Sequence, residues 1–258
     1  MIMAAGLSAI AVMTPMPAFG VDIYNSNGFE TQTFVEGQLV GQNGWIGVPP
    51  LSLGAANVAT GRSKAYAGLQ AVEVRGEDLA HQDFINSGTN GYYDAIGSYR
   101  RPVNYDTAAH LTPGVSIQAW VRIDGPSSPT STNFFSASIA ARVLLSDGTA
   151  GIGELAISSD GYAHGYSGNE DVPTFQTSAP VALGMWHLLI IHLDFNARTY
   201  SFFVDGIALG GPFLFPSDAG NSNSLARGSL VTYSAPDAGK LMKSRYVARY
   251  DNFAITTP

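Results

Sequence analysis

Apolar and polar side chains alternate along three stretches of this chain, and a period of two is typical of half-buried β-strands. Residues 114–124 carry apolar side chains on one side and polar or charged ones on the other. Residues 133–146 and 69–75 repeat the arrangement. Because an apolar face must be covered, each stretch predicts a strand with one face toward a core.

The most apolar part of the sequence, Leu183–Gly210, predicts three strands joined by tight turns. Trp186–Asp194 and Thr199–Val204 are rich in β-branched and aromatic residues, which suit a pleated surface. The Asp205-Gly206 dipeptide supplies the left-handed residue that a tight hairpin requires before a short third strand. We expect this meander to be framework, with Trp186 in the core.

Other strands are expected at residues 153–158, 161–168, 229–233 and 246–256, with Phe29 and Glu30 opening the first strand. Residues 78–104 are polar and rich in tyrosine, which predicts only a weak strand and a long loop. No window has helical periodicity, and no repeat or linker divides the chain. The sequence therefore predicts a single all-β domain, a two-sheet antiparallel β-sandwich, over residues 21–258.

The N-terminal stretch, residues 1–20, contains no charged residue and ends in Ala18-Phe19-Gly20, a pattern that suits signal peptidase. We interpret it as a secretory leader, which predicts a secreted, periplasmic or cell-surface protein; a buried N-terminal segment is the alternative. The stretch is too short and too broken by proline to span a bilayer, and no later stretch is a transmembrane candidate.

Charge and cysteine content narrow the possible partners. The chain has 20 acidic and 13 basic residues and a formal net charge of -7. Nothing in this balance favours nucleic acid or an anionic membrane as partner, because both require a basic surface. The sequence has no cysteine, which excludes disulfides, thiolate metal sites and a cysteine nucleophile.

Four short motifs resemble the laminin-G-like members of the concanavalin A-like lectin/glucanase superfamily. They are the strand Ser116–Asp124, the meander Trp186–Gly206, the closing run Tyr250-Asp251-Asn252-Phe253 and the opening Gly28-Phe29-Glu30. The resemblance implies a jelly roll whose last strand pairs beside the first and in which one curved sheet commonly forms the ligand face. Fold alone does not give function.

If the alternating strands lie in one sheet, their polar faces place aromatic rings among hydrogen-bonding groups. The candidate ligand-binding residues are Glu73, Arg75, Gln118, Trp120, Arg122, Arg142, Tyr162, His164 and Tyr166. Such a surface suits a glycan, because sugar C–H faces stack on aromatic rings while polar groups bind hydroxyls. We therefore predict a lectin-like carbohydrate-binding domain without catalysis. Alternatively, Trp120 is a framework residue under a loop, and Arg122 and Arg142 are solvated strand-face charges.

Two further hypotheses remain. A polysaccharide lyase would act on a uronate polymer by β-elimination, with Arg75, Gln118 and Arg122 neutralising the carboxylate and His164 and Tyr166 moving protons. The sequence departs from alginate-lyase-like strands, since Arg75 lacks a partner arginine at the start of its strand and Gln118 precedes Ala119-Trp120. Glycoside hydrolysis is less favoured, because the family's Glu-x-Asp-x-x-Glu carboxylates are absent. The third hypothesis is a structural or adhesive surface protein that associates with itself.

Calcium is the one cofactor that the resemblance suggests, as a structural ion. Asp22, Glu30 and Asp251 are the candidate ligands, because carboxylate oxygens suit Ca²⁺ and the first and last strands should adjoin. The Asp-Gly aspartates are interpreted first as turn formers.

Overall fold

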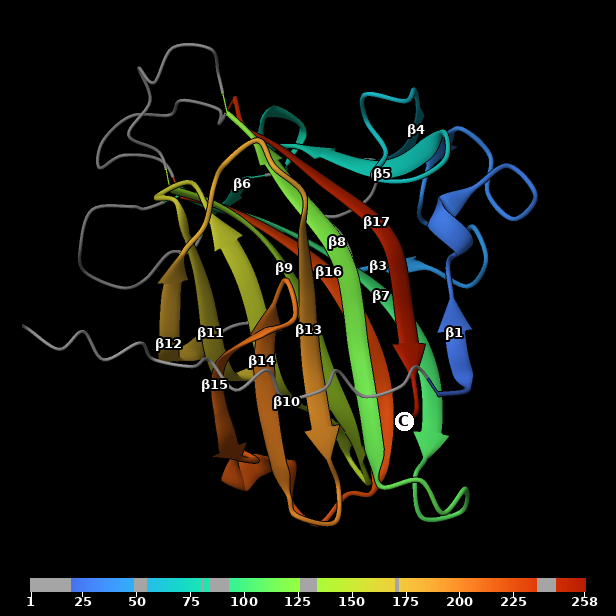
Figure 1. Cartoon of the computed structure of the whole chain (residues 1–258), viewed down its shortest axis with the longest axis vertical. Helices are drawn as coiled ribbons and strands as arrows, with labels where there is room; N and C mark the ends of the chain where they lie inside the picture. Colours follow the sequence, from blue (N-terminus) through green and yellow to red (C-terminus); the bar gives the residue numbers. More distant parts are fainter. Residues whose placement is uncertain are drawn as a thin grey trace, which may run out of the picture.

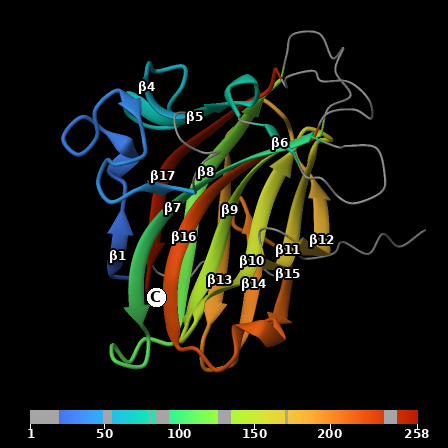
Figure 2. The same cartoon turned by 180° about the vertical axis from the view of Figure 1, so that it is seen from behind.

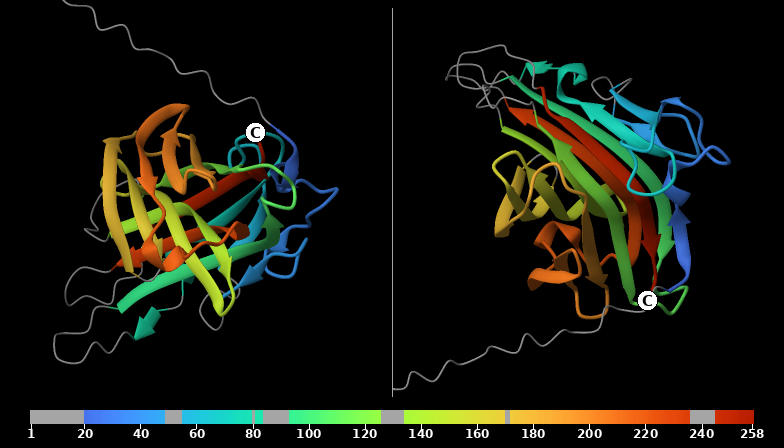
Figure 3. Two further views of the ribbon diagram at one scale, coloured as in Figure 1. Left: turned by 90° about the horizontal axis from the view of Figure 1, so that it is seen from below. Right: turned by 45° about the horizontal axis from the view of Figure 1, so that its top comes forward.

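Two antiparallel sheets packed face to face make up this protein, as the alternating strands predict (Figures 1 and 3). The computed structural model describes residues 20–48, 55–79, 81–83, 93–125, 134–169, 172–235 and 245–258. Apart from Gly20, the predicted leader lies outside the described residues. We call the nine-stranded layer sheet A and the eight-stranded layer sheet B.

Each sheet draws strands from both halves of the chain. In spatial order, sheet A contains β15 (Ile207–Leu214), β14 (Thr199–Val204), β13 (His187–Asp194), β8 (Gly114–Asp124), β17 (Val247–Thr256), β5 (Gln70–Arg75), β4 (Ala56–Thr60) and β2 (Gly37–Gln38), with β1 (Asp22–Asn25) also beside β17. Sheet B contains β12 (Val172–Pro180), β11 (Tyr162–Asn169), β10 (Gly148–Ser158), β9 (Phe134–Leu145), β16 (Ser224–Ala235), β7 (Tyr93–Asp106) and β3 (Ile46–Gly47), with β6 (His81–Asp83) also beside β7. Three short 3-10 helices, η1 (Asn27–Phe29), η2 (Gly76–Asp78) and η3 (Ser217–Ala219), lie in connections.

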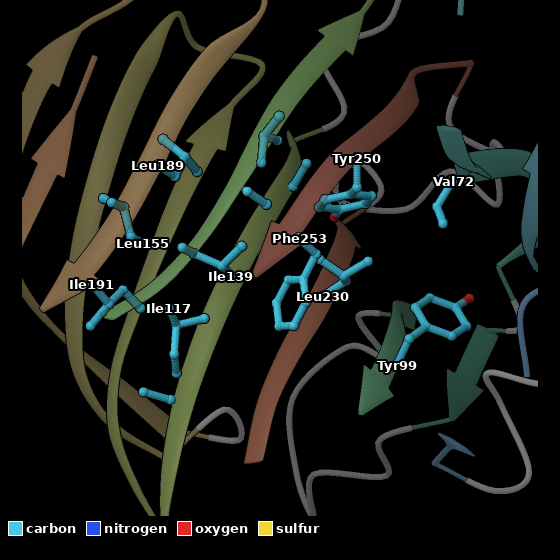
Figure 4. Packing of buried hydrophobic residues seen from close by; sticks show 14 of the residues in the cluster. Val72, Tyr99, Ile117, Ile139, Leu155, Leu189, Ile191, Leu230, Tyr250 and Phe253 are labelled. Atoms are coloured by element: carbon cyan, nitrogen blue, oxygen red, sulfur yellow. The ribbon is translucent and has the colours of Figure 1, made fainter. Parts of the chain in front are cut away.

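The core lies between the sheets and is built from the inward half of each alternating strand. Ile117 of β8 and Leu189 of β13 face Ile139 of β9 and Leu155 of β10 across it (Figure 4). All four side chains are fully buried. Burying such branched side chains is the main favourable term in folding, and it fixes which residues of each strand remain for the outer face.

One buried tyrosine carries its polar end into this core. Tyr250 of β17 donates its hydroxyl to the carbonyl of Val231 at 2.6 Å and contacts the Thr232 hydroxyl at 2.8 Å. Burial raises the pKa of Tyr250 far above its usual value. The neutral phenol therefore links β17 of sheet A to β16 of sheet B without leaving an unsatisfied group.

Most predicted strands are confirmed. β8 and β14 have the predicted bounds, β13 differs from its predicted bounds by one residue at one end, and β9 and β11 differ by one residue at each end. β17 pairs with β1, as the resemblance implies. The meander forms β13, β14 and β15 at one end of sheet A.

Three predictions were wrong. Residues 93–106 form a long inner strand of sheet B, β7, rather than a weak strand and a loop. β12 was not predicted at all. Phe29 lies in η1 rather than opening a strand, because Asn27, Gly28 and Phe29 all have positive φ.

Candidate functional site

The nine predicted ligand-binding residues lie on two different surfaces. Those from β5 and β8, which are Glu73, Arg75, Gln118, Trp120 and Arg122, belong to the outer face of sheet A. Those from β9 and β11, which are Arg142, Tyr162, His164 and Tyr166, belong to the outer face of sheet B. The expectation that they share one surface is wrong, because alternation tells which side of a strand is polar and not which sheet the strand joins.

On sheet A, the predicted charges form a network with Asp124 and Arg249, which were not predicted as site residues. Glu73 contacts Arg75 at 2.9 Å and Arg249 at 3.0 Å. Asp124 contacts Arg122 at 2.6 Å and also contacts Arg249. Burial opposes ionisation of Glu73, but hydrogen bonds from Arg75 and Arg249 outweigh it and lower the pKa of this carboxyl. Arg75 and Arg122 thus already have carboxylate partners, which leaves them poorly suited to neutralise a uronate.

Beside this network, three aromatic side chains are grouped around Tyr66. Its ring stacks on Trp120 with a centroid distance of 3.7 Å and lies edge-on to Trp186 at 6.1 Å. Trp120 is therefore packed under a loop, which was the framework interpretation of this residue. Trp186 is only half-buried, on the outer face, and its assignment to the core was wrong.

The loop that carries Tyr66 is held by two of the predicted calcium ligands. Asp251, with 0% of its surface exposed, accepts hydrogen bonds from the backbone N–H groups of Tyr66 and Ala67. Its second oxygen accepts from the N–H of Asn252. Glu30 accepts from Leu69 and Gln70 through one oxygen.

These contacts weigh against a shared calcium site at this place. Asp22 lies opposite Thr256 in the β1–β17 register, farther along β17 than Asp251, and binds the Asn25 amide at 3.0 Å. Within the described residues, no group of three or more His, Cys, Asp or Glu is placed to hold a metal ion. The three carboxylates do not fit a common cation, and the structural calcium ion stays a prediction.

A serine and a histidine also meet on sheet A. The Ser116 hydroxyl lies 3.0 Å from Nδ1 of His192, and burial lowers the pKa of this histidine. Both residues sit in mid-strand, paired with each other and with Thr256 and Ser201 on their outer sides. Their backbone therefore serves the sheet ladder, whereas an acyl-transfer site needs N–H groups aimed at an oxyanion.

On sheet B, the strand registers arrange the outward residues in rows that cross the sheet. One row runs Arg100, Ser229, Ala140, Glu154, Tyr166 and Phe175. The next runs Ser98, Val231, Ser138, Ala156, His164 and Ser178. In the first row the small residues Ser229 and Ala140 lie between Arg100 and Glu154; in the second row His164 is the only large side chain. Figure 2 shows this sheet nearest the viewer, with β7, β16, β9 and β10 side by side.

At one end of these rows is an aromatic cluster, which we define as Tyr162, His164, Tyr166 and Phe175. His164 lies 6.0 to 6.2 Å from each of the other three rings, measured between centroids. Tyr162 is 44% exposed and Phe175 is 56% exposed. Sequence analysis missed Phe175 because β12 was not predicted; an aromatic residue between polar ones was the only available signal.

Polar contacts orient the centre of this cluster. Nε2 of His164 lies 2.9 Å from the Asp160 carboxylate, and the buried Nδ1 has no hydrogen-bond partner in the described structure. Burial, together with the negative charges of Glu154 and Asp160, raises the pKa of Tyr166. A tyrosine that ionises less readily than usual is a poor general base, which further weakens the lyase hypothesis.

At the other end is an arginine cluster, which we define as Arg100, Arg142 and Arg227. Arg142 and Arg227 are direct cross-strand partners, and Arg100 lies opposite Ser229. Only Arg142 was predicted as a site residue. Arg100 and Arg227 were missed because 78–104 predicts only a weak strand and a long loop and β16 was expected to begin at 229, two residues after Arg227.

No helix in the described parts of the chain is long and apolar enough to cross a membrane.

Comparisons with known proteins place the fold in a family. The family model described as concanavalin A-like lectin/glucanases superfamily matches residues 97–255, more than half of the chain. No curated protein sequence matches significantly. The carbohydrate esterase vb_24B_21 from the Shiga toxin-encoding bacteriophage phi24B is 14% identical, with 92% of this chain and 99% of that chain covered and a TM-score of 0.52.

Two other solved structures are similar at lower TM-scores. The Emp47p carbohydrate recognition domain is 10% identical, with 95% of this chain and 99% of that chain covered and a TM-score of 0.48. The carbohydrate-binding module CBM66 from Bacillus subtilis is 8% identical, with 83% and 95% covered and a TM-score of 0.45. At such identities, likeness shows the fold alone.

Proposed function

We propose that this chain, which belongs to the concanavalin A-like lectin/glucanases superfamily, is a secreted or surface carbohydrate-binding domain that uses the outer face of sheet B. The observation that carries the proposal is the aromatic cluster beside the row of small and polar residues that ends at Arg100. Exposed Tyr162 and Phe175 offer faces for sugar C–H groups, and the polar side chains of Glu154, His164 and Tyr166 lie half-buried on the same face.

Sheet B is preferred over sheet A because two rings of its aromatic cluster, Tyr162 and Phe175, are exposed. On sheet A, Glu73 and Asp124 contact two arginines each, and Trp120 is covered by Tyr66. On sheet B, Nδ1 of His164 is a buried polar atom without a partner in the described structure. The exposed rings beside this histidine, rather than its buried nitrogen, are the groups that a ligand can contact directly.

Binding without catalysis is the function that this geometry supports best. A lyase would need its neutralising and proton-moving groups within reach of one sugar. Arg75, Gln118 and Arg122 lie on sheet A, whereas His164 and Tyr166 lie on sheet B. The leader interpretation of residues 1–20 supports export as part of the same proposal.

Affinity electrophoresis through a panel of neutral and acidic polysaccharides, followed by titration of the retained polymer, tests the proposal. We expect Tyr162→Ala and Phe175→Ala each to weaken binding about 10-fold, since stacking contacts and excluded water are lost. Tyr66→Ala, which removes a 44% exposed ring from sheet A, is the matched control and should bind like the wild type. Loss of binding in Tyr66→Ala alone would move the site to sheet A, and no retention on any polymer would refute carbohydrate binding.

A further inference from the structure

The arginine cluster is an arrangement that sheet geometry alone does not favour. Arg142 and Arg227 are direct cross-strand partners on neighbouring strands. Arg100, on the next strand, lies opposite Ser229, the outward residue that follows Arg227. Like charges directly opposite each other destabilise a sheet. Each arginine also has a contact within the protein, so the inference rests on their grouping and not on a missing partner.

The arginine cluster is positively charged, whereas the whole chain is negatively charged. The formal net charge is -7, with only 13 lysines and arginines in 258 residues. Nevertheless, three arginines lie together in the Arg142–Arg227 pair and the adjoining row, whereas two carboxylates, Glu154 and Asp160, lie toward the aromatic cluster. The Ser138 hydroxyl already donates to Glu154 at 2.5 Å. A local excess of positive charge on an acidic protein selects for an anion at that place.

We propose that the glycan bound by sheet B is acidic, with its carboxylate or sulfate groups on the arginine cluster and neighbouring sugar rings against the aromatic cluster. This inference rests on the function proposed above and names its ligand class. The planar guanidinium pairs with two oxygens of an oxyanion, and such charge-assisted contacts are about twice as strong as neutral hydrogen bonds. The small residues between the clusters, Ser229, Ala140 and Ala156, are themselves buried. A ligand on this face therefore meets the larger side chains around them, of which Arg100 and Arg227 are half-buried.

Matched polymers test the ligand class. Polygalacturonate is compared with highly methyl-esterified pectin, which has the same backbone with most carboxylates masked, and dextran sulfate is compared with dextran. We expect binding to the charged member of at least one pair to be about 10-fold tighter and to weaken as salt rises from 0.05 to 0.5 M, because salt screens ionic attraction. The pair that shows the difference tells carboxylate from sulfate.

Variants locate the charge effect. Arg142→Gln and Arg227→Gln should each weaken binding to the acidic polymer about 10-fold, and Arg227→Lys, which keeps the charge but loses the planar fork, should fall between them and the wild type. Arg62→Gln removes the same charge from an exposed loop and should bind normally. Thermal unfolding of each variant checks that it folds. If Arg142→Gln does not fold, Arg227→Lys still tests the arginine cluster.

The possible failures are distinguishable. Binding to neutral and acidic polymers with equal affinity, but dependent on Phe175, would overturn the acidic ligand and leave carbohydrate binding in place. Acidic binding that Arg227→Gln and Arg62→Gln reduce equally would show nonspecific attraction and also overturn it. No binding to any polymer would overturn both proposals.

Discussion

The outer faces of the two sheets use similar residues in opposite ways. On sheet A, Glu73 and Asp124 each contact two arginines, and Tyr66 covers Trp120. On sheet B, an arginine faces an arginine across two strands, and aromatic rings remain exposed. The difference teaches that charge and aromatic content do not identify a binding face. On sheet A opposite charges are neighbours, whereas on sheet B two arginines are, and four experiments probe this contrast.

The largest effect is expected where the sheet A network is opened. Glu73→Ala removes a carboxylate that is 6% exposed and leaves Arg249 without one of its partners. Breaking a buried ion pair by removing one member should lower the free energy of unfolding by about 4 kcal/mol. Urea unfolding measures it. Arg75→Gln, at the exposed side of the network, is the control and should cost less than about 1 kcal/mol; equal losses would mean that the network is not a buried one.

The next effect is a dependence of stability on pH. Burial outweighs three backbone N–H donors and raises the pKa of Asp251 from 3.8 to about 6. Between these values the folded protein holds more protons than the unfolded chain. The free energy of unfolding should therefore fall as pH rises from about 4 to about 6, by up to roughly 3 kcal/mol.

Comparing Asp251→Asn with the wild type isolates this contribution. The variant has no titrating carboxyl at this position, so its stability should change less over that pH range. Asp147→Asn, in an exposed turn, changes the same charge elsewhere and should follow the wild-type profile. A pH profile of Asp251→Asn that superimposes on the wild type would mean that donors, not burial, control this carboxyl.

A smaller loss is expected from the Tyr66 ring. Its stacking on Trp120 and edge contact with Trp186 should make Tyr66→Ala about 1 kcal/mol less stable. Tyr66→Phe keeps the ring and should unfold like the wild type. If Tyr66→Ala leaves stability unchanged, the loop rather than the ring holds Trp120 in place.

The smallest change in stability is expected on sheet B. Tyr162→Ala and Phe175→Ala remove rings that are 44% and 56% exposed, and each should alter the free energy of unfolding by less than about 0.5 kcal/mol while weakening glycan binding. Denaturation and binding are measured on the same samples. A loss of stability as large as that of Glu73→Ala would contradict the contrast, because the aromatic cluster would then be framework.

The positions of the strands could be predicted from the sequence better than which strands pair with one another. Alternation in 114–124 correctly separates Ile117 from Gln118, because burial on one face imposes a local period of two. Which strands join is a long-range property. Glu73 and Arg249 are 176 positions apart in sequence, and no local sequence pattern predicts their contact.

The same limit explains the missed parts of sheet B. Residues 78–104 predict only a weak strand and a long loop because they are polar and rich in tyrosine, and the outward positions of β7 carry serine and arginine. Those polar residues are the ones that the outer face presents. The hydrophobic pattern is therefore weakest in the strands that carry the candidate site. Because the bounds of β7 and β16 were not predicted, Arg100 and Arg227 were not predicted as site residues.

If sheet B binds a glycan as proposed, the row from Arg100 to Phe175 sets the length of sugar chain that fits it. It crosses six strands, from β7 to β12, and at about 4.8 Å per strand its ends lie roughly 24 Å apart. A monosaccharide touches only one end of such a row, whereas a chain of several sugars touches both. Affinity should therefore climb with the degree of polymerisation and level off once the oligomer reaches across the sheet.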